Sequence, residues 1–150
     1  MITFSVEGLP VPQGSKSLAH GGGKTWMRDA NASRLKPWRE KVARAADVGE
    51  TFDCPVMVVA VFYLPRPKKL RWWAPAGRVG DLDKLCRAIL DGCEAGGLLA
   101  DDARVTHLRA VKRYEDESNP VGVRVLVMED TPAFRPDKID AVARRLMEGS

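Results

Sequence analysis

Hydrophobic residues recur along the chain with the two periodicities that separate strands from helices. Alternating runs, together with one unbroken apolar run closed by prolines, predict four strands. The predicted strands are residues 2–7, 55–65, 105–114 and 121–128. Residues 115–120, between the last two strands, are predicted to form a hairpin turn.

Apolar residues spaced three and four apart predict three amphipathic helices. Two of them span residues 33–47 and 81–95, and Pro136 opens the third. Gly96 and Gly97 end the second helix, because glycine is favoured just beyond a helix C-terminus. Residues 8–25, rich in glycine and small polar residues, are predicted to form a long loop.

The order of these elements predicts an α+β (mixed α/β) fold, in which helices pack on one small mixed β-sheet. A length of 150 residues suits a single domain, and no internal repeat is visible. Within this domain, 1–150, we expect a basic loop at residues 65–80 and a C-terminal helical tail at residues 130–150.

The composition favours a soluble protein that stays inside the cell. Hydrophobic residues make up 45% of the chain and charged residues 29%. The longest apolar run, Val56 to Leu64, is about half as long as a membrane helix, and the first residues lack the features of a signal peptide. The chain has an odd number of cysteines and no closely spaced pair among them, so we expect buried thiols at Cys54, Cys86 and Cys93. The expected location is the cytoplasm, without a membrane partner.

The net charge of +4 conceals an asymmetry between the two halves of the chain. Residues 1–80 carry 13 Lys and Arg against 6 Asp and Glu, whereas residues 81–150 carry 11 against 14. A basic half joined to an acidic half indicates that one region binds a polyanion and the other binds something cationic.

The basic loop combines cations with aromatic side chains. It holds five Lys or Arg residues and no acidic residue: Arg66, Lys68, Lys69, Arg71 and Arg78. Trp72 and Trp73 are interleaved among them. Because cations track phosphates and indoles stack on unpaired bases, this pattern is typical of binding to branched or single-stranded nucleic acid. The alternative is a solvated loop whose tryptophans fold into the core.

Four aspartates stand at the ends of the second helix. Asp81 and Asp83 lie where loop becomes helix, and Asp101 and Asp102 follow the helix end. Each of them alone could cap a helix or form a turn. If Asp81 is a non-helical cap, its carboxylate and that of Asp83 can converge on one Mg²⁺ ion. A third carboxylate, from Asp102, would complete an acidic pocket of the kind that hydrolyses phosphodiesters.

The helix leaves two ways to assemble such a pocket. A helix from residue 81 to 95 is about 20 Å long at 1.5 Å per residue. The chain must therefore bring Asp102 back along that length, or Asp102 must meet Asp81 and Asp83 of a second subunit. The segment 96–101 can just span the distance when extended, at about 3.3 Å per residue, so the sequence leaves both routes open.

Other catalytic patterns are weak or missing. Residues 21–25 resemble the end of a phosphate-binding P-loop, but Leu18 stands where that motif requires glycine, so we expect a flexible loop instead. His20 and His107 are too isolated for a metal site or a catalytic triad, and no Gly-x-Ser-x-Gly elbow is present.

The segment from Asp81 to Val105 resembles the RusA family of Holliday-junction resolvases. The resemblance covers this segment closely and most of the rest of the chain more loosely. The matching residues are Asp81-Leu82-Asp83-Lys84-Leu85, Arg87, Ile89-Leu90-Asp91, Gly97-Leu98-Leu99 and Asp101-Asp102-Ala103-Arg104-Val105.

The resemblance implies a small homodimeric endonuclease that cuts four-way DNA junctions by paired nicks, in a bacterium or a phage-infected host. It implies Mg²⁺ as the cofactor, with Mn²⁺ as a substitute, and no small-molecule cofactor. The family's essential carboxylates, which would hold the metal and act in catalysis, fall on Asp81, Asp83 and Asp102. Two rival functions are a junction-binding protein without catalysis and a phosphotransferase with an Asp-x-Asp metal site.

Two positions depart from the family's pattern. Lys84 replaces an asparagine, and Arg87 replaces a functional lysine. Either Arg87 or Lys84 would then offset the charge of the transition state, so both are candidate catalytic residues. The side chains expected to face DNA are Lys16, Lys24, Arg66, Lys68, Lys69, Arg71, Trp72, Trp73 and Arg78.

Overall fold

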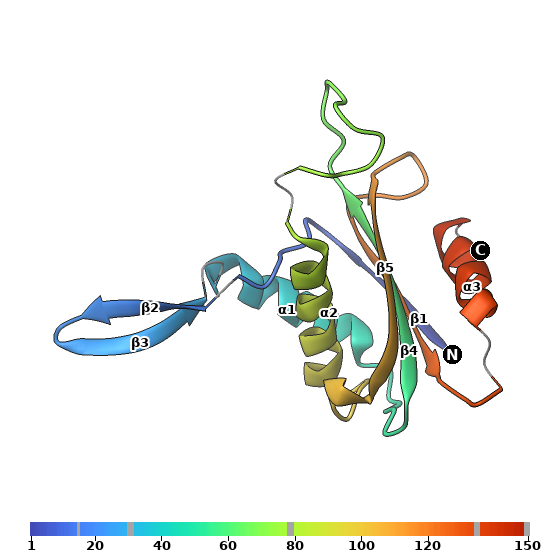
Figure 1. Ribbon diagram of the computed structural model, residues 1–150, viewed down its shortest axis with the longest axis horizontal. Coiled ribbons are helices and arrows are strands. Elements are labelled where there is room, and N and C mark those ends of the chain that lie inside the picture. The colour runs from blue at the N-terminus through green and yellow to red at the C-terminus, as the bar shows by residue number, and fades with distance from the viewer. Residues whose placement is uncertain (15, 30–31, 78–79, 134–135, 149–150) are drawn as a thin grey trace.

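The computed structural model describes residues 1–14, 16–29, 32–77, 80–133 and 136–148 (Figure 1). Of residues 16–20, 24–29 and 136 only the backbone is described. A four-stranded sheet forms the middle layer, with helices α1 and α2 on one face and helix α3 on the other (Figure 1). This arrangement confirms the expected α+β class.

The sheet has the strand order β1-β6-β4-β5 and is mixed. Its central strand β4 is parallel to β5 and antiparallel to β6, which in turn pairs with β1. The four strands are β1 (Ile2–Glu7), β4 (Val56–Leu64), β5 (Val105–Tyr114) and β6 (Gly122–Glu129). Each begins and ends within one residue of the predicted position.

The predicted hairpin at residues 115–120 is wrong, because β5 and β6 are not neighbours in the sheet. All nine residues of β4 are buried, so this strand takes the position between them. Residues 115–120 therefore cross the end of β4, where Asp116 accepts hydrogen bonds from the side-chain amide of Asn119. Alternation along β5 and β6 reveals which residues share a face but not which strand lies alongside.

The predicted long loop at residues 8–25 is also wrong in its second half. Strands β2 (Lys16–Gly21) and β3 (Lys24–Asp29) pair there as an antiparallel hairpin that extends away from the rest of the molecule (Figure 1). Gly22 and Gly23 form its turn with φ of 55° and 73°, the left-handed conformation of a type I′ turn. The Gly-Lys pair therefore stands at a hairpin turn, which confirms that it is no P-loop.

Two glycines allow α1 (Ala32–Ala46) and α2 (Leu82–Ala95) to pack closely. A Cβ atom added at Gly92 would lie 2.5 Å from Cγ1 of Val42, and one added at Gly96 would overlap the carbonyl oxygen of Ala43. The two helices then bury Leu35, Trp38, Leu85 and Ile89 against the sheet.

Helix α3 (Pro136–Glu148) covers the opposite face of the sheet. Its Ala143 joins a small apolar cluster with Val59 and Leu126, and Arg109 of β5 forms an ion pair with Asp140. The tail predicted at residues 130–150 thus contains one helix, residues 136–148, which packs on the sheet. No helix in the described ranges has the length and apolarity needed to cross a membrane.

The three cysteines are free thiols, and the prediction that they are buried is confirmed for Cys86 and Cys93 but is wrong for Cys54. Burial raises the pKa of Cys86 to about 11 and the pKa of Cys93 to about 12. Cys54 is only partly buried. Cys86 and Cys93 are therefore protonated and unreactive at neutral pH, since the thiolate is the reactive form.

The close approach of the two helices predicts that Gly96→Ala destabilises the fold by about 1–3 kcal/mol. The new methyl group would meet the backbone of Ala43, which cannot turn aside as a side chain can. Urea denaturation followed by circular dichroism measures the change. Gly77→Ala is the control, because a Cβ atom there has no neighbour within 4 Å. A loss for Gly96→Ala no larger than for the control would contradict this packing.

Candidate functional site

The start of α2 is held in place by contacts from two other segments. Gly80, just before the helix, has a φ of +108°, and its carbonyl oxygen accepts a 3.1 Å hydrogen bond from Nζ of Lys112 in β5. Gln13 donates its backbone N–H to the carbonyl of Lys84 at 3.0 Å. A Cβ atom at Gly80 would lie 3.0 Å from the Pro12 ring. The chain can therefore enter α2 in this way only with glycine at position 80.

Asp81 is the N-cap residue of α2 and has the extended backbone, with φ −72° and ψ 139°, that the sequence allowed for. Its carboxylate makes no capping hydrogen bond and lies 3.3 Å from Nζ of Lys84. The Asp81 side chain is 72% exposed, and Asp83 in the first helical turn is also exposed. Both carboxylates are thus accessible to solvent at the N-terminal end of the helix.

Asp101 and Asp102 have different roles in the short 3₁₀-helix η1 (Asp102–Arg104). Asp101 is the N-cap, and its Oδ1 accepts a 2.7 Å hydrogen bond from the N–H of Ala103. Asp102 donates its own N–H to Oε2 of Glu94 at the end of α2. Its carboxylate has no hydrogen bond or ion pair with any residue the structure describes. The turn predicted at these two residues is thus stabilised by the Asp101 side chain, whereas the Asp102 side chain remains exposed.

The two carboxylate groups lie at opposite ends of α2 (Figure 1). Helix α2 has 14 residues, which corresponds to about 20 Å from one end to the other. Across the described residues, no group of three His, Cys, Asp or Glu side chains could hold a metal ion. Within one protomer the described structure therefore does not bring Asp102 to Asp81 and Asp83.

The two candidate cations differ in their surroundings. Lys84 lies one turn from Asp81, forms an ion pair with it, and is partly exposed. Arg87 is exposed and has no ion pair within the described part of the chain. It lies four residues after Asp83, on the same face of α2. A phosphate at the start of α2 would therefore find the guanidinium of Arg87 without a competing carboxylate.

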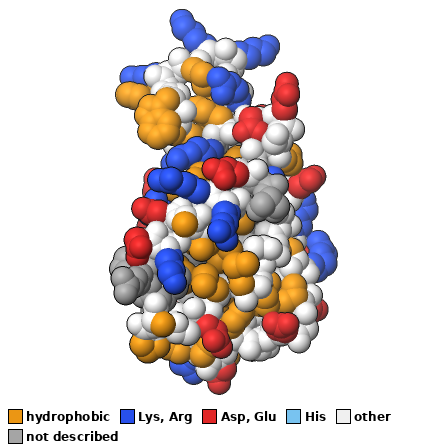
Figure 2. Space-filling view, turned by 90° about the vertical axis from the view of Figure 1, so that its right-hand side faces the viewer, with side chains coloured by type: hydrophobic (Ala, Val, Ile, Leu, Met, Phe, Trp, Pro, Cys, Tyr) orange, Lys and Arg blue, Asp and Glu red, His pale blue; other side chains and the backbone are white. Residues whose placement is uncertain are grey.

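The basic loop projects from the same end of the molecule as the start of α2 (Figure 1). In Figure 2, Lys and Arg side chains gather with hydrophobic ones at this end. Trp73 is 83% exposed and Trp72 is 50% exposed, so the alternative of tryptophans folded into the core is wrong. The exposed cations of the loop are Arg66, Lys68, Lys69 and Arg71.

Arginines lie over three aromatic rings in and beside the loop. Arg71 stands 5.2 Å from the ring centre of Trp72, and Arg113 of β5 stands 5.5 Å from that of Trp73. Arg66 stands 6.0 Å from the ring centre of Tyr114. Arg113 was missed by the sequence analysis, because nothing in the sequence distinguishes it from any other cation in a strand.

Three predicted DNA-facing residues cannot be assessed as side chains. Arg78 lies outside the described residues, and Lys16 and Lys24 are described by their backbone only. Lys16 begins β2, and Lys24 follows the turn at the tip of the hairpin.

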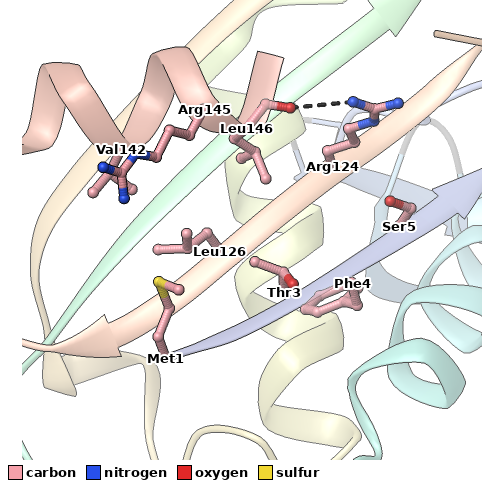
Figure 3. Close-up of a pocket in the computed structure, with 9 residues that line it drawn as sticks. All are labelled: Met1, Thr3, Phe4, Ser5, Arg124, Leu126, Val142, Arg145 and Leu146. Atoms are coloured by element: carbon pink, nitrogen blue, oxygen red, sulfur yellow. Dashed lines mark hydrogen bonds between the residues drawn. The ribbon is translucent and has the colours of Figure 1, made fainter. Parts of the chain in front are cut away.

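A cavity of about 420 Å³ lies elsewhere, between α3 and the strands β1 and β6 (Figure 3). Apolar side chains line it together with Arg124 and Arg145, and none of the lining residues is acidic. Arg124 donates a hydrogen bond to the carbonyl of Leu146, which ties α3 to the sheet (Figure 3). The cavity therefore offers no carboxylate ligands for a metal ion.

A protein-family model described as endodeoxyribonuclease RusA matches residues 7–126 of this chain. The matched region contains the basic loop and all four aspartates, and it ends before α3. A search of the curated proteins finds no match.

The strain at Gly80 predicts that Gly80→Ala loosens the first turn of α2. Alanine at this φ, pressed against Pro12, costs about 1–3 kcal/mol. We expect the amide of Leu85, which bonds to the carbonyl of Asp81, to exchange its hydrogen at least about tenfold faster. Hydrogen exchange followed by NMR measures this, with Gly77→Ala as the control. Unchanged exchange at Leu85 would show that Gly80 does not fix the helix start.

Proposed function

The chain belongs to the RusA endodeoxyribonuclease family, and we propose that it is a magnesium-dependent enzyme that resolves four-way DNA junctions by paired, symmetric nicks. The observation that carries this proposal is the pair of exposed carboxylates at the start of α2, directly after the basic loop. The proposed metal site then follows directly, along the chain, on the loop that is proposed to bind branched DNA.

Asp81 and Asp83 fit a divalent metal such as Mg²⁺, or Mn²⁺ in its place. Both provide carboxylate oxygens, the ligands that Mg²⁺ prefers, and both are open to water and to a phosphate. When bound, the metal lowers the pKa of a coordinated water and aligns it with the scissile phosphate. The ammonium group of Lys84, 3.3 Å from the Asp81 carboxylate, offsets part of the negative charge at this end of the helix.

A homodimer would complete the site. If a two-fold axis crosses α2 near its middle, the start of each helix lies beside the end of its partner. Asp102 of the partner subunit then becomes the third carboxylate beside Asp81 and Asp83. The same operation creates two equivalent sites, as paired nicks in two strands require.

We assign to Arg87 the role of offsetting the charge of the phosphate. Lys84 already pairs with Asp81, whereas Arg87 is exposed and unpaired in the described structure. Its guanidinium can form two parallel hydrogen bonds to one phosphate. The basic loop then holds the neighbouring phosphates, and the β2–β3 hairpin, with Lys16 and Lys24, reaches along a DNA arm.

We expect Asp83→Asn to lower Mg²⁺-dependent cleavage of a four-way junction on the order of a hundredfold or more, because an amide is a poor ligand for Mg²⁺. The substitution preserves the shape of the side chain, so binding of the junction should persist. An end-labelled junction and a matched linear duplex, each with and without Mg²⁺, test this. A wild-type protein that binds the junction and never cuts it would instead indicate a binding protein.

The two aspartates after α2 provide a matched pair of variants. Asp101→Asn retains an oxygen that can accept the hydrogen bond of Ala103, so cleavage should change by less than about threefold. Asp102→Asn removes the proposed metal ligand and should reduce cleavage as strongly as Asp83→Asn does. Equal losses from both variants would mean that this turn acts only through its structure.

A further inference from the structure

We propose that Trp73, supported by Arg113, stacks on an unpaired base at the branch point and so selects junctions over linear duplex DNA. This inference rests on the proposed function, because it requires that the protein bind branched DNA. Arg113 comes from strand β5 rather than from the loop, and the adjacent Trp72 and Trp73 have different roles.

The exposure of Trp73 has no structural explanation within the protomer. Its side chain is 83% exposed, whereas Trp38 in the core is only 4% exposed. Leu70 and Trp72 in the same loop are exposed as well, and large apolar side chains grouped on the surface indicate a partner that covers them. Arginine and lysine side chains surround Trp73 in the loop, and residues 65–80 include no acidic residue. A polyanion with flat apolar groups fits both features.

Arg113 holds the indole of Trp73 from one side. Its guanidinium carbon lies 5.5 Å from the ring centre, and its Nη1 donates a 2.9 Å hydrogen bond to the carbonyl of Lys112. Because Arg113 belongs to β5, it gives the exposed indole a support from the rigid sheet. A side chain that is already ordered loses less entropy when a base stacks on its open face.

Trp72 has a different environment. It is 50% exposed, and its arginine partner, Arg71, belongs to the same loop at a distance of 5.2 Å. Among the described residues, the arginine over Trp72 thus comes from the loop itself, whereas the arginine over Trp73 comes from the sheet. We assign Trp72 to general contact with the DNA backbone and assign branch recognition to Trp73 alone.

The base of the loop is fixed relative to the sheet. Arg66 donates its backbone N–H to Oε1 of Glu115 at 3.2 Å, and Glu115 donates its N–H to the carbonyl of Leu64 at 2.9 Å. Eight residues lead from Trp73 to Asp81, a reach of at most about 28 Å. With a rise of 3.4 Å per base pair, a base on Trp73 lies within about eight base pairs of the proposed cut.

The geometry distinguishes a branch point from a duplex. In a continuous duplex each base is covered on both sides by its neighbours, so an indole finds no free face without unstacking the helix. At a branch point the stacking is interrupted, and a base offers a face at lower cost. Stacking on Trp73 therefore favours the junction, whereas the loop's cations bind both DNAs alike.

The test compares the wild type with Trp73→Ala, Trp73→Phe and Trp72→Ala in buffer with Ca²⁺ in place of Mg²⁺. One arm measures affinity for a four-way junction and for a linear duplex by fluorescence anisotropy. The other arm places 2-aminopurine at the branch point and records its fluorescence, which reports stacking. We expect Trp73→Ala to lower the preference for the junction on the order of tenfold and to abolish the fluorescence change. Trp73→Phe should restore part of both, and Trp72→Ala should weaken binding to the two DNAs equally.

Each other outcome overturns a particular claim. A Trp73→Ala protein with unchanged preference and unchanged 2-aminopurine response refutes the stacking role and leaves the nuclease proposal intact. Equal loss of preference in Trp72→Ala and Trp73→Ala refutes the separate roles. A wild type that prefers duplex to junction, or binds neither, refutes the proposed function itself.

Discussion

The parallel pairing of β4 with β5 is the constraint on which the rest of this structure depends. Parallel neighbours cannot be joined by a tight turn, so the chain must return along the sheet, and it does so through α2. The helix then sets the distance between the residues that precede and follow it. Asp81 and Asp83 are placed at one end and Asp102 at the other, about 20 Å apart. A single protomer cannot close that gap, because η1 is attached to the end of α2 through Glu94.

The same crossover explains why the basic loop lies beside the start of α2. The basic loop leaves the C-terminal end of β4 and returns at the N-terminus of α2. In sheets with parallel strands, binding sites form at this end. Contacts from β5, through Lys112 and Arg113, reach both the helix start and the loop. The proposed metal site and the proposed DNA-binding loop thereby share the same support from β5.

Most of the fold could be predicted from the sequence, since long periodic segments such as β4 and α2 determine their own conformation. The strand order could not be predicted, because alternation in β5 and β6 does not encode which strand lies between them. The β2–β3 hairpin was missed because its glycines favoured a loop interpretation. The spacing of Asp81, Asp83 and Asp102 identified the candidate site. The position of Asp102 and the exposure of Trp73 required the three-dimensional structure, because both depend on contacts between distant segments.

The central claim is that each active site takes its carboxylates from two subunits. Co-expression of Asp83→Asn and Asp102→Asn chains with different affinity tags allows the mixed dimer to be purified. If each active site is shared between subunits, one of the mixed dimer's two sites contains both substitutions and the other contains neither. The mixed dimer should then nick a four-way junction at about half the wild-type rate and leave singly nicked products. If the mixed dimer is as inactive as either parent, the carboxylates act within one subunit and the account is wrong.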